Sequence, residues 1–214
     1  MKALNADAWL LLSETYGFIG NSLLKPMNQT PSIGLDPAFW DEFPAVFSGE
    51  RVDAGLAKLR DYAVAAGELG EDGAIENASV EYTRLFIGPP APAAPPWETM
   101  NRADGVTVGF GEATFAMRRL LRDAGLELKN ENNQYEDHIG IELLYLSELC
   151  RRIADGEPGA LDPTEVESFI EEHPLAWISA LRGKVEAEYP HGYIAGMLEL
   201  AEGVLIWQRE AVAS

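Results

Sequence analysis

Apolar side chains recur at helical spacing along most of this chain, as they do on the buried face of an α-helix. Asp-Pro pairs at 36–37 and 162–163 open two such segments, because Asp caps a helix and Pro fits its first turn. Only 106–108, which read VTV, alternate as a strand would. The pattern predicts an all-α fold of about nine or ten helices. The expected helices cover 7–24, a short segment within 36–43, 53–69, 75–87, 112–125, 135–154, 163–173, 175–189 and 191–210.

A proline-rich stretch, GPPAPAAPPW at 88–97, interrupts this pattern and begins a predicted loop over 88–109. Proline prefers an extended backbone and loses little entropy on ordering, so the stretch is suited to pass over the protein surface as a rigid, ordered segment. Leu85 and Phe86 precede it and Trp97 ends it. These three side chains are either core packing under the loop or the lining of a pocket beside it.

The totals indicate one globular domain over residues 1–214, with 47% hydrophobic and 24% charged residues. The net charge of −19 argues against nucleic acid or an anionic membrane surface as the main partner. It favours a basic partner, or serves only to keep the protein soluble. We expect a monomer or a dimer, since the 88–109 connection is long enough to allow exchange of helices between two copies.

The chain also carries signals of location. Its single cysteine, Cys150, excludes an internal disulfide and fits a reducing compartment. The first residues hold Asp7 and Glu14 within a short apolar run, unlike a targeting peptide. No run approaches the roughly 18 apolar residues that span a bilayer. We therefore expect a cytoplasmic protein without stable membrane insertion.

Catalytic motifs are sparse. The sequence lacks GxSxG, HExxH, a phosphate-binding GxxxxGK[ST] and a GxGxxG that follows a strand, which argues against an enzyme of those classes. His138 and Glu142 share one helix face, with Asp137 beside them, so a small helical metal-dependent hydrolase is the alternative function. No second Glu-x-x-His copy supports a di-metal site, and we expect no metal or other cofactor. Asp137 and His138 equally fit a role in capping the helix.

Three segments in order, EYTRLFIGP at 81–89, PPWE at 95–98 and EDHIGIELLYLSEL at 136–149, resemble the TorD/DmsD family of redox-enzyme maturation chaperones. The resemblance implies an all-helical, non-enzymatic cytoplasmic chaperone. Its expected partner is the twin-arginine leader, or the apo catalytic subunit, of a molybdopterin-containing respiratory oxidoreductase. The chaperone would hold this client for cofactor insertion before export. A helical scaffold that binds only the folded enzyme is a third possibility.

Carried onto this chain, the family's leader-binding surface would include Tyr82, Leu85, Phe86, Pro96, Trp97, Asp137 and His138, with Glu98, Glu136 and Glu142 in support. A carboxylate such as that of Asp137 suits a leader guanidinium. The large apolar side chains suit the leader's apolar stretch. The chain departs from the family after Trp97, where a serine and an aromatic usually follow, although Thr99 keeps a hydroxyl.

Overall fold

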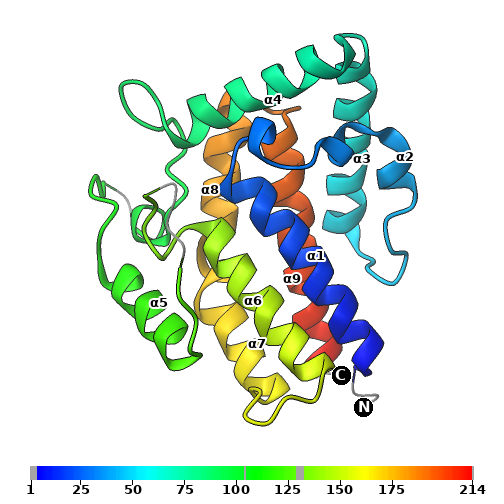
Figure 1. Cartoon of the computed structure of the whole chain (residues 1–214). Helices are drawn as coiled ribbons and strands as arrows, with labels where there is room; N and C mark the ends of the chain where they lie inside the picture. Colours follow the sequence, from blue (N-terminus) through cyan, green and yellow to red (C-terminus); the bar gives the residue numbers. More distant parts are fainter. Residues whose placement is uncertain (1–3, 104, 129–132, 214) are drawn as a thin grey trace. The chain divides into compact units, whose positions relative to one another are not determined.

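The computed structural model describes residues 4–103, 105–128 and 133–213, which form nine α-helices and three short 3₁₀ turns (Figure 1). No β-strand occurs in these residues; one isolated bridge joins Trp97 and His138. The prediction of an all-α fold is therefore confirmed. The helices are α1 Ala6–Leu24, α2 Pro37–Asp41, α3 Glu50–Gly67, α4 Gly70–Phe86, α5 Glu112–Asp123, α6 Ile139–Ala154, α7 Pro163–Glu172, α8 Pro174–Glu188 and α9 Tyr193–Ala213.

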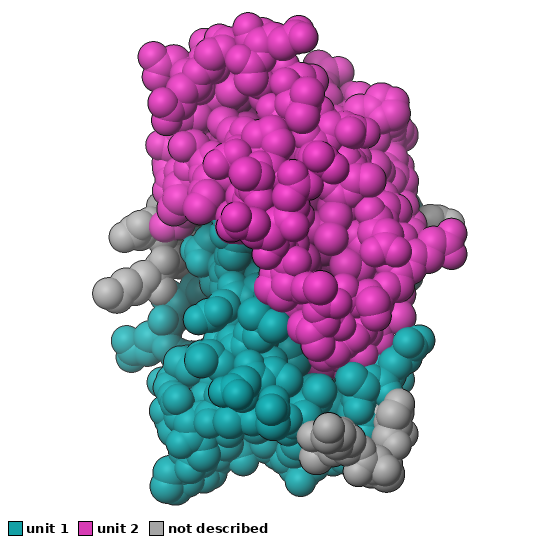
Figure 2. Space-filling model, turned by 90° about the vertical axis from the view of Figure 1, so that its right-hand side faces the viewer, with its two compact units in different colours: residues 1–24, 96–177, 209–214 teal, residues 25–95, 178–208 magenta. Residues whose placement is uncertain are grey.

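The chain divides into two compact units, coloured separately in Figure 2. Unit 1 holds residues 1–24, 96–177 and 209–214, and unit 2 holds 25–95 and 178–208. The unit boundaries fall within α8 and α9, so neither unit is one continuous segment. The expectation of a single domain stays a prediction. Of the described residues, no helix combines the length and apolar character that crossing a membrane requires.

In unit 1, α1 and α6 lie side by side in close contact (Figure 1). Small residues make this approach possible, because a Cβ added to Gly140 would lie 2.7 Å from the carbonyl oxygen of Gly20. The hydroxyl of Ser147 donates to the carbonyl oxygen of Ser13 at 2.7 Å on the same contact. The glycines are therefore needed where the two backbones meet.

In unit 2, the proline-rich stretch is attached to the end of α4 by backbone hydrogen bonds. The N–H of Ala93 donates to the carbonyl oxygen of Arg84 at 3.2 Å, and that of Ala94 to Leu85 at 2.9 Å. The side chain of Ala94 is buried. Over these residues the stretch is anchored against its helix and is not a free linker.

Two predicted helix starts, at residues 53 and 75, are late, because α3 begins at Glu50 and α4 at Gly70. Both first turns carry acidic residues, which the positive end of the helix dipole favours and solvent accepts. Apolar residues at helical spacing mark only the buried face of a helix. A helix start inferred from them therefore falls after a first turn that is polar. The opposite error occurs at α6, which begins at Ile139 and not at 135.

Candidate functional site

The proline-rich segment and the segment before α6 meet in unit 1. The backbone N–H of Glu98 donates to the carbonyl oxygen of Asp137 at 2.9 Å, and that of Ile139 donates to Pro96 at 3.0 Å. Trp97 therefore pairs with His138 as an isolated antiparallel bridge. Two of the three sequence motifs are brought together by main-chain hydrogen bonds.

Asp137 organises this junction from a fully buried position. Its Oδ2 accepts the backbone N–H and the hydroxyl of Thr99, and its Oδ1 accepts the hydroxyl of Thr114 at 3.0 Å. Burial raises the pKa of Asp137, and the hydrogen bonds from Thr99 and Thr114 oppose that rise. Both carboxylate oxygens accept hydrogen bonds within the protein. Asp137 therefore joins residues 96–99, which we call the tryptophan segment, to α5 and α6.

His138 is the N-cap of α6. Its Nδ1 accepts the backbone N–H of Gly140 at 3.0 Å, which leaves the ring proton on Nε2. Burial lowers the pKa of His138 to about 3, so the ring is neutral near pH 7. The capping interpretation of this residue fits the geometry.

A buried group of ionisable side chains lies beside the junction. Glu98 pairs with Arg102 through Oε1, and its Oε2 lies 2.8 Å from Nδ1 of His173. Glu142 accepts the indole N–H of Trp177 on Oε2 at 3.1 Å. Its Oε1 is buried and has no donor among the described residues.

The two carboxylates of this group differ in electrostatics. Burial, followed by the charge of Glu98, raises the pKa of Glu142 well above its usual range. Burial acts in the same direction on Glu98, but His173 and Arg102 outweigh it and lower the pKa. Of the two carboxylates, Glu142 is therefore the one whose negative charge the neighbouring side chains do not offset.

An exposed aromatic patch covers part of unit 1, made of Trp97, Phe110, Phe115 and Tyr135. Phe110 lies 4.9 Å from Phe115 and 5.6 Å from Tyr135 between ring centres, and Tyr135 lies 5.7 Å from Trp97. Phe115 is 48% exposed, and Phe110 and Tyr135 are 38% exposed. Apolar groups gathered at the surface in this way often mark a binding site.

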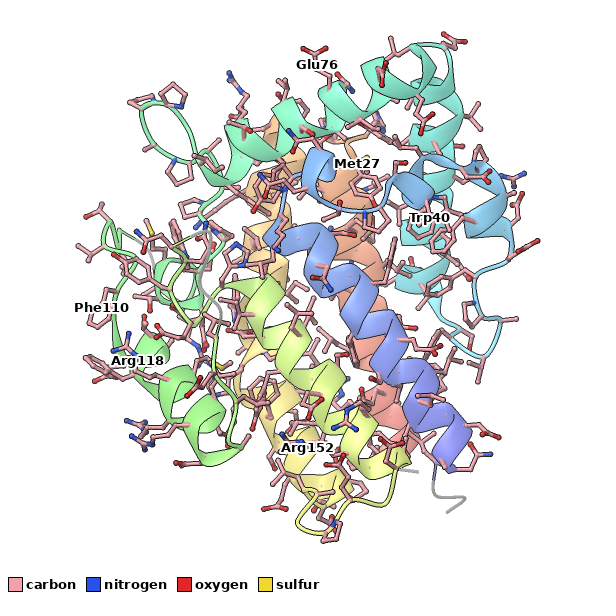
Figure 3. All side chains as sticks on the ribbon, viewed as in Figure 1. Met27, Trp40, Glu76, Phe110, Arg118 and Arg152 are labelled. Carbon is pink, nitrogen blue, oxygen red and sulfur yellow. The ribbon has the colours of Figure 1, made fainter. Side chains whose placement is uncertain are left out.

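Arg118 borders the aromatic patch. Figure 3 shows it beside Phe110, and its guanidinium lies 5.7 Å from that ring centre. It also donates to both carboxylate oxygens of Glu136, at 2.7 and 3.0 Å. Glu136, a predicted supporting residue, is therefore already paired with an arginine of its own chain.

A cavity of about 850 Å³ opens next to the patch and shares Phe115 with it. We refer to it as the acidic pocket. Its charged and polar lining consists of Glu98, Glu112, Glu171, Glu172, Arg102, Arg119 and His173. Glutamates outnumber arginines there, and the three outside the buried group, on α5 and α7, are exposed to solvent.

The structure divides the predicted peptide-binding residues between the units. Pro96, Trp97, Asp137 and His138 come together in unit 1. Tyr82, Leu85 and Phe86 belong to the last turns of α4 in unit 2, where all three are buried. Their role in binding a peptide stays a prediction.

The hydrolase alternative required Asp137, His138 and Glu142 to act together on a metal. The oxygens of Asp137 are occupied by threonines, and Nδ1 of His138 caps α6. In the described part of the chain, Glu142 instead groups with Glu98 and His173. That alternative receives no support from the geometry or from the relatives described below.

Sequence reasoning missed most of the exposed surface. It did not single out Phe115 as a surface residue, whereas α5 buries Met117 and Leu121 and exposes Phe115. Glu171, Glu172 and His173 could not be connected to Glu98 from sequence, because only the tertiary fold brings them together.

Known proteins match this chain over much of its length. A family model described as nitrate reductase delta subunit matches residues 49–182. The Tat proofreading chaperone DmsD of Salmonella typhimurium is 29% identical over 138 residues, 64% of this chain and 63% of that protein. The probable Tat proofreading chaperone DmsD of Haemophilus influenzae is 32% identical over 107 residues, 50% and 48% of the two chains.

A more distant relative matches over a longer region. The chaperone protein TorD of Shewanella amazonensis is 24% identical over 216 residues, 89% of this chain and 85% of that protein. By contrast, the matches to the two DmsD proteins cover less than two thirds of either relative. The family model itself spans more than half of the chain. The resemblance of the motifs is thus confirmed, and the chain belongs to the nitrate reductase delta subunit family, that of the TorD/DmsD-type chaperones.

Proposed function

We propose that this protein is a cytoplasmic chaperone for a molybdopterin-containing oxidoreductase. It binds the twin-arginine leader or the apo catalytic subunit of that enzyme and holds it for cofactor insertion before export. The names of the Salmonella and Shewanella relatives, a Tat proofreading chaperone and a chaperone protein, support this function. Its action is binding, without a catalytic step.

The observation that carries the proposal is the contact between the aromatic patch and the acidic pocket. A twin-arginine leader presents two guanidinium groups next to an apolar stretch, so its receptor needs carboxylates beside an apolar surface. Phe115 belongs to both features, which places them within reach of one short peptide. The exposed glutamates of the pocket, Glu112, Glu171 and Glu172, would bind the arginines, and the rings would cover the apolar stretch.

The predicted residues take different roles in this proposal. Trp97 contributes a partly exposed ring to the patch. Asp137 and His138 position the segments that carry it, because their polar atoms are used inside the protein. Leu85 and Phe86 are buried at the end of α4, so the proposal gives them a role in packing that helix and leaves the leader's apolar stretch to the rings of the patch.

The test is titration of the full chain with a synthetic twin-arginine leader and with the same peptide carrying two alanines in place of the arginines. We expect saturable binding that the alanine peptide loses by at least about tenfold, a difference of about 1.4 kcal/mol. Equal binding of both peptides, or no binding of either, would refute leader recognition.

A matched pair of protein variants assigns the arginines to the pocket. The double variant Glu171→Gln, Glu172→Gln removes two pocket charges, while Asp7→Asn, Glu14→Gln removes two exposed charges from α1. The pocket variant should weaken binding of the arginine leader more than the α1 variant does. Equal effects would mean that only the overall negative charge attracts the leader.

A further inference from the structure

We propose that Glu98, Glu142 and His173 form a binding site for a divalent transition-metal cation, with Zn²⁺ best matched by their donor atoms. The three residues come from the turn after Trp97, from the first turn of α6 and from the junction of α7 and α8. One donor atom from each lies within 4.8 Å of the others. The assignment of this site does not rest on the proposed leader binding, although Glu98 and His173 also line the acidic pocket.

Each carboxylate directs one oxygen toward the other members of the group; that of Glu98 is hydrogen-bonded to Nδ1 of His173, and a bound ion would replace this bond by taking both atoms as ligands. Arg102 holds Oε1 of Glu98, and Oε2 of that residue faces His173. Trp177 holds Oε2 of Glu142, and Oε1 has no donor. Partners that fix the ligand side chains in this way are a regular feature of metal sites.

The histidine ring is held as well. It stacks on Phe169 with a distance of 5.0 Å between ring centres and an angle of 27°. Its Nδ1 points toward Glu98, on the side of the cluster. Two carboxylates and one imidazole are ligands that Zn²⁺ accepts, with water completing its coordination.

Burial separates this cluster from ordinary surface acids. Glu142 is fully buried with an unpartnered oxygen, and Glu98 is 1% exposed. Two buried carboxylates facing each other repel unless a positive charge or a proton lies between them, and Arg102 compensates only Glu98. A divalent cation would supply the missing charge.

An ion can reach the cluster from solvent. Glu98 and His173 both line the acidic pocket, which leads from the surface to the buried group. The glutamates at its mouth would raise the local concentration of cations. By linking three segments of unit 1, the bound ion would stabilise the junction that carries the aromatic patch.

Isothermal titration with Zn²⁺ tests the site, on full-length protein without a polyhistidine tag and after treatment with a chelator. We expect one ion per chain and a higher melting temperature with Zn²⁺. Glu142→Gln keeps the shape of the side chain and an acceptor for Trp177, and should weaken binding at least about 100-fold. His173→Gln, at the pocket wall, should do the same.

Glu14→Gln is the matched control, since it removes an exposed carboxylate of α1 that lies outside the pocket and is not a proposed ligand. It should leave Zn²⁺ affinity within about twofold of the unmodified protein, as expected for a charge that does not touch the ion. Absence of Zn²⁺ binding to the unmodified protein would overturn the proposal. Equal binding to the protein and to folded Glu142→Gln or His173→Gln would also overturn it, because the ion would then sit elsewhere. Circular dichroism confirms that each variant is folded.

Discussion

The carboxylate of Asp137 accepts two hydrogen bonds from Thr99, at 2.9 Å from the backbone nitrogen and 2.7 Å from the hydroxyl oxygen. With the bond from Thr114, this carboxylate connects the tryptophan segment, α5 and the start of α6. The sequence predicts that Asp137 binds a leader arginine. In the structure, this aspartate holds three segments of the chain together. Its variants must be interpreted through stability before they are interpreted through binding.

Asp137→Ala should destabilise the protein by about 3 kcal/mol, because it removes the acceptor of three donors, the buried hydroxyl of Thr114 and the two partly buried donors of Thr99. Urea unfolding followed by circular dichroism measures the change. Asp162→Ala is the control, since it removes a carboxylate that caps α7 in an exposed position, at a cost of about 1 kcal/mol. Equal losses in the two variants would contradict the central role of Asp137.

Gly140→Ala should destabilise the protein by about 2 to 3 kcal/mol, because α1 and α6 must separate to admit a methyl group. The added Cβ would meet backbone atoms of α1, which cannot turn aside as a side chain can. Gly183→Ala serves as its control in an exposed position of α8 with open space around it. That change should stabilise the protein by up to about 1 kcal/mol, and thermal unfolding distinguishes the two signs.

Local patterns were sufficient for the helices, whereas the meeting of the motifs was implied only by the resemblance to the family. Capping was one of the two roles that the sequence left open for His138, and the Asp162 cap of α7 followed from the Asp-Pro pair. Long-range partners were beyond reach, since Glu98 and His173 are 75 positions apart and nothing local to either side chain specifies the other. Their contact depends on how α6, α7 and the tryptophan segment pack.

Phe115 shows why the exposed surface was missed. Apolar spacing assumes that large apolar residues face the core, which holds for Met117 and Leu121 on the same helix. A binding surface breaks this assumption, because its apolar residues are kept at the surface for a partner. Sequence pattern alone therefore mistakes such residues for core.

The pH dependence of stability should contain a contribution from His138. Its pKa in the folded protein is about 3, below the ordinary histidine value, so folding disfavours its proton. Full stability is present above about pH 6.5 and is lost as the pH falls toward 3, by roughly 4 to 5 kcal/mol in total. His138→Asn keeps an N-cap acceptor but does not titrate, so its stability should fall less over that range.

Urea unfolding at several pH values between about 4 and 7 measures this difference. The comparison concerns how steeply the free energy of unfolding changes with pH. Its absolute value is not compared, because the His138→Asn variant also loses packing contacts, which lowers stability at every pH. Parallel curves for the two proteins would mean that the ring of His138 accepts a proton in the folded state without cost.

Phe115→Ala should weaken binding of the leader by about 5- to 30-fold, or about 1 to 2 kcal/mol, because the ring joins the aromatic patch to the acidic pocket. Its folding should change little, since the side chain is 48% exposed. Leu10→Ala, at an apolar position of α1 that is 44% exposed, is the matched control and should bind normally.

A second peptide tests whether the ring of Phe115 contacts the apolar stretch of the leader. In a leader with polar residues in place of its apolar stretch, Phe115→Ala should cost little further affinity, because the ring has lost its partner. The double variant of Glu171 and Glu172 should still weaken that peptide, since it acts on the arginines. If Phe115→Ala weakened both peptides equally, the ring would support the shape of the pocket and would not contact the apolar stretch.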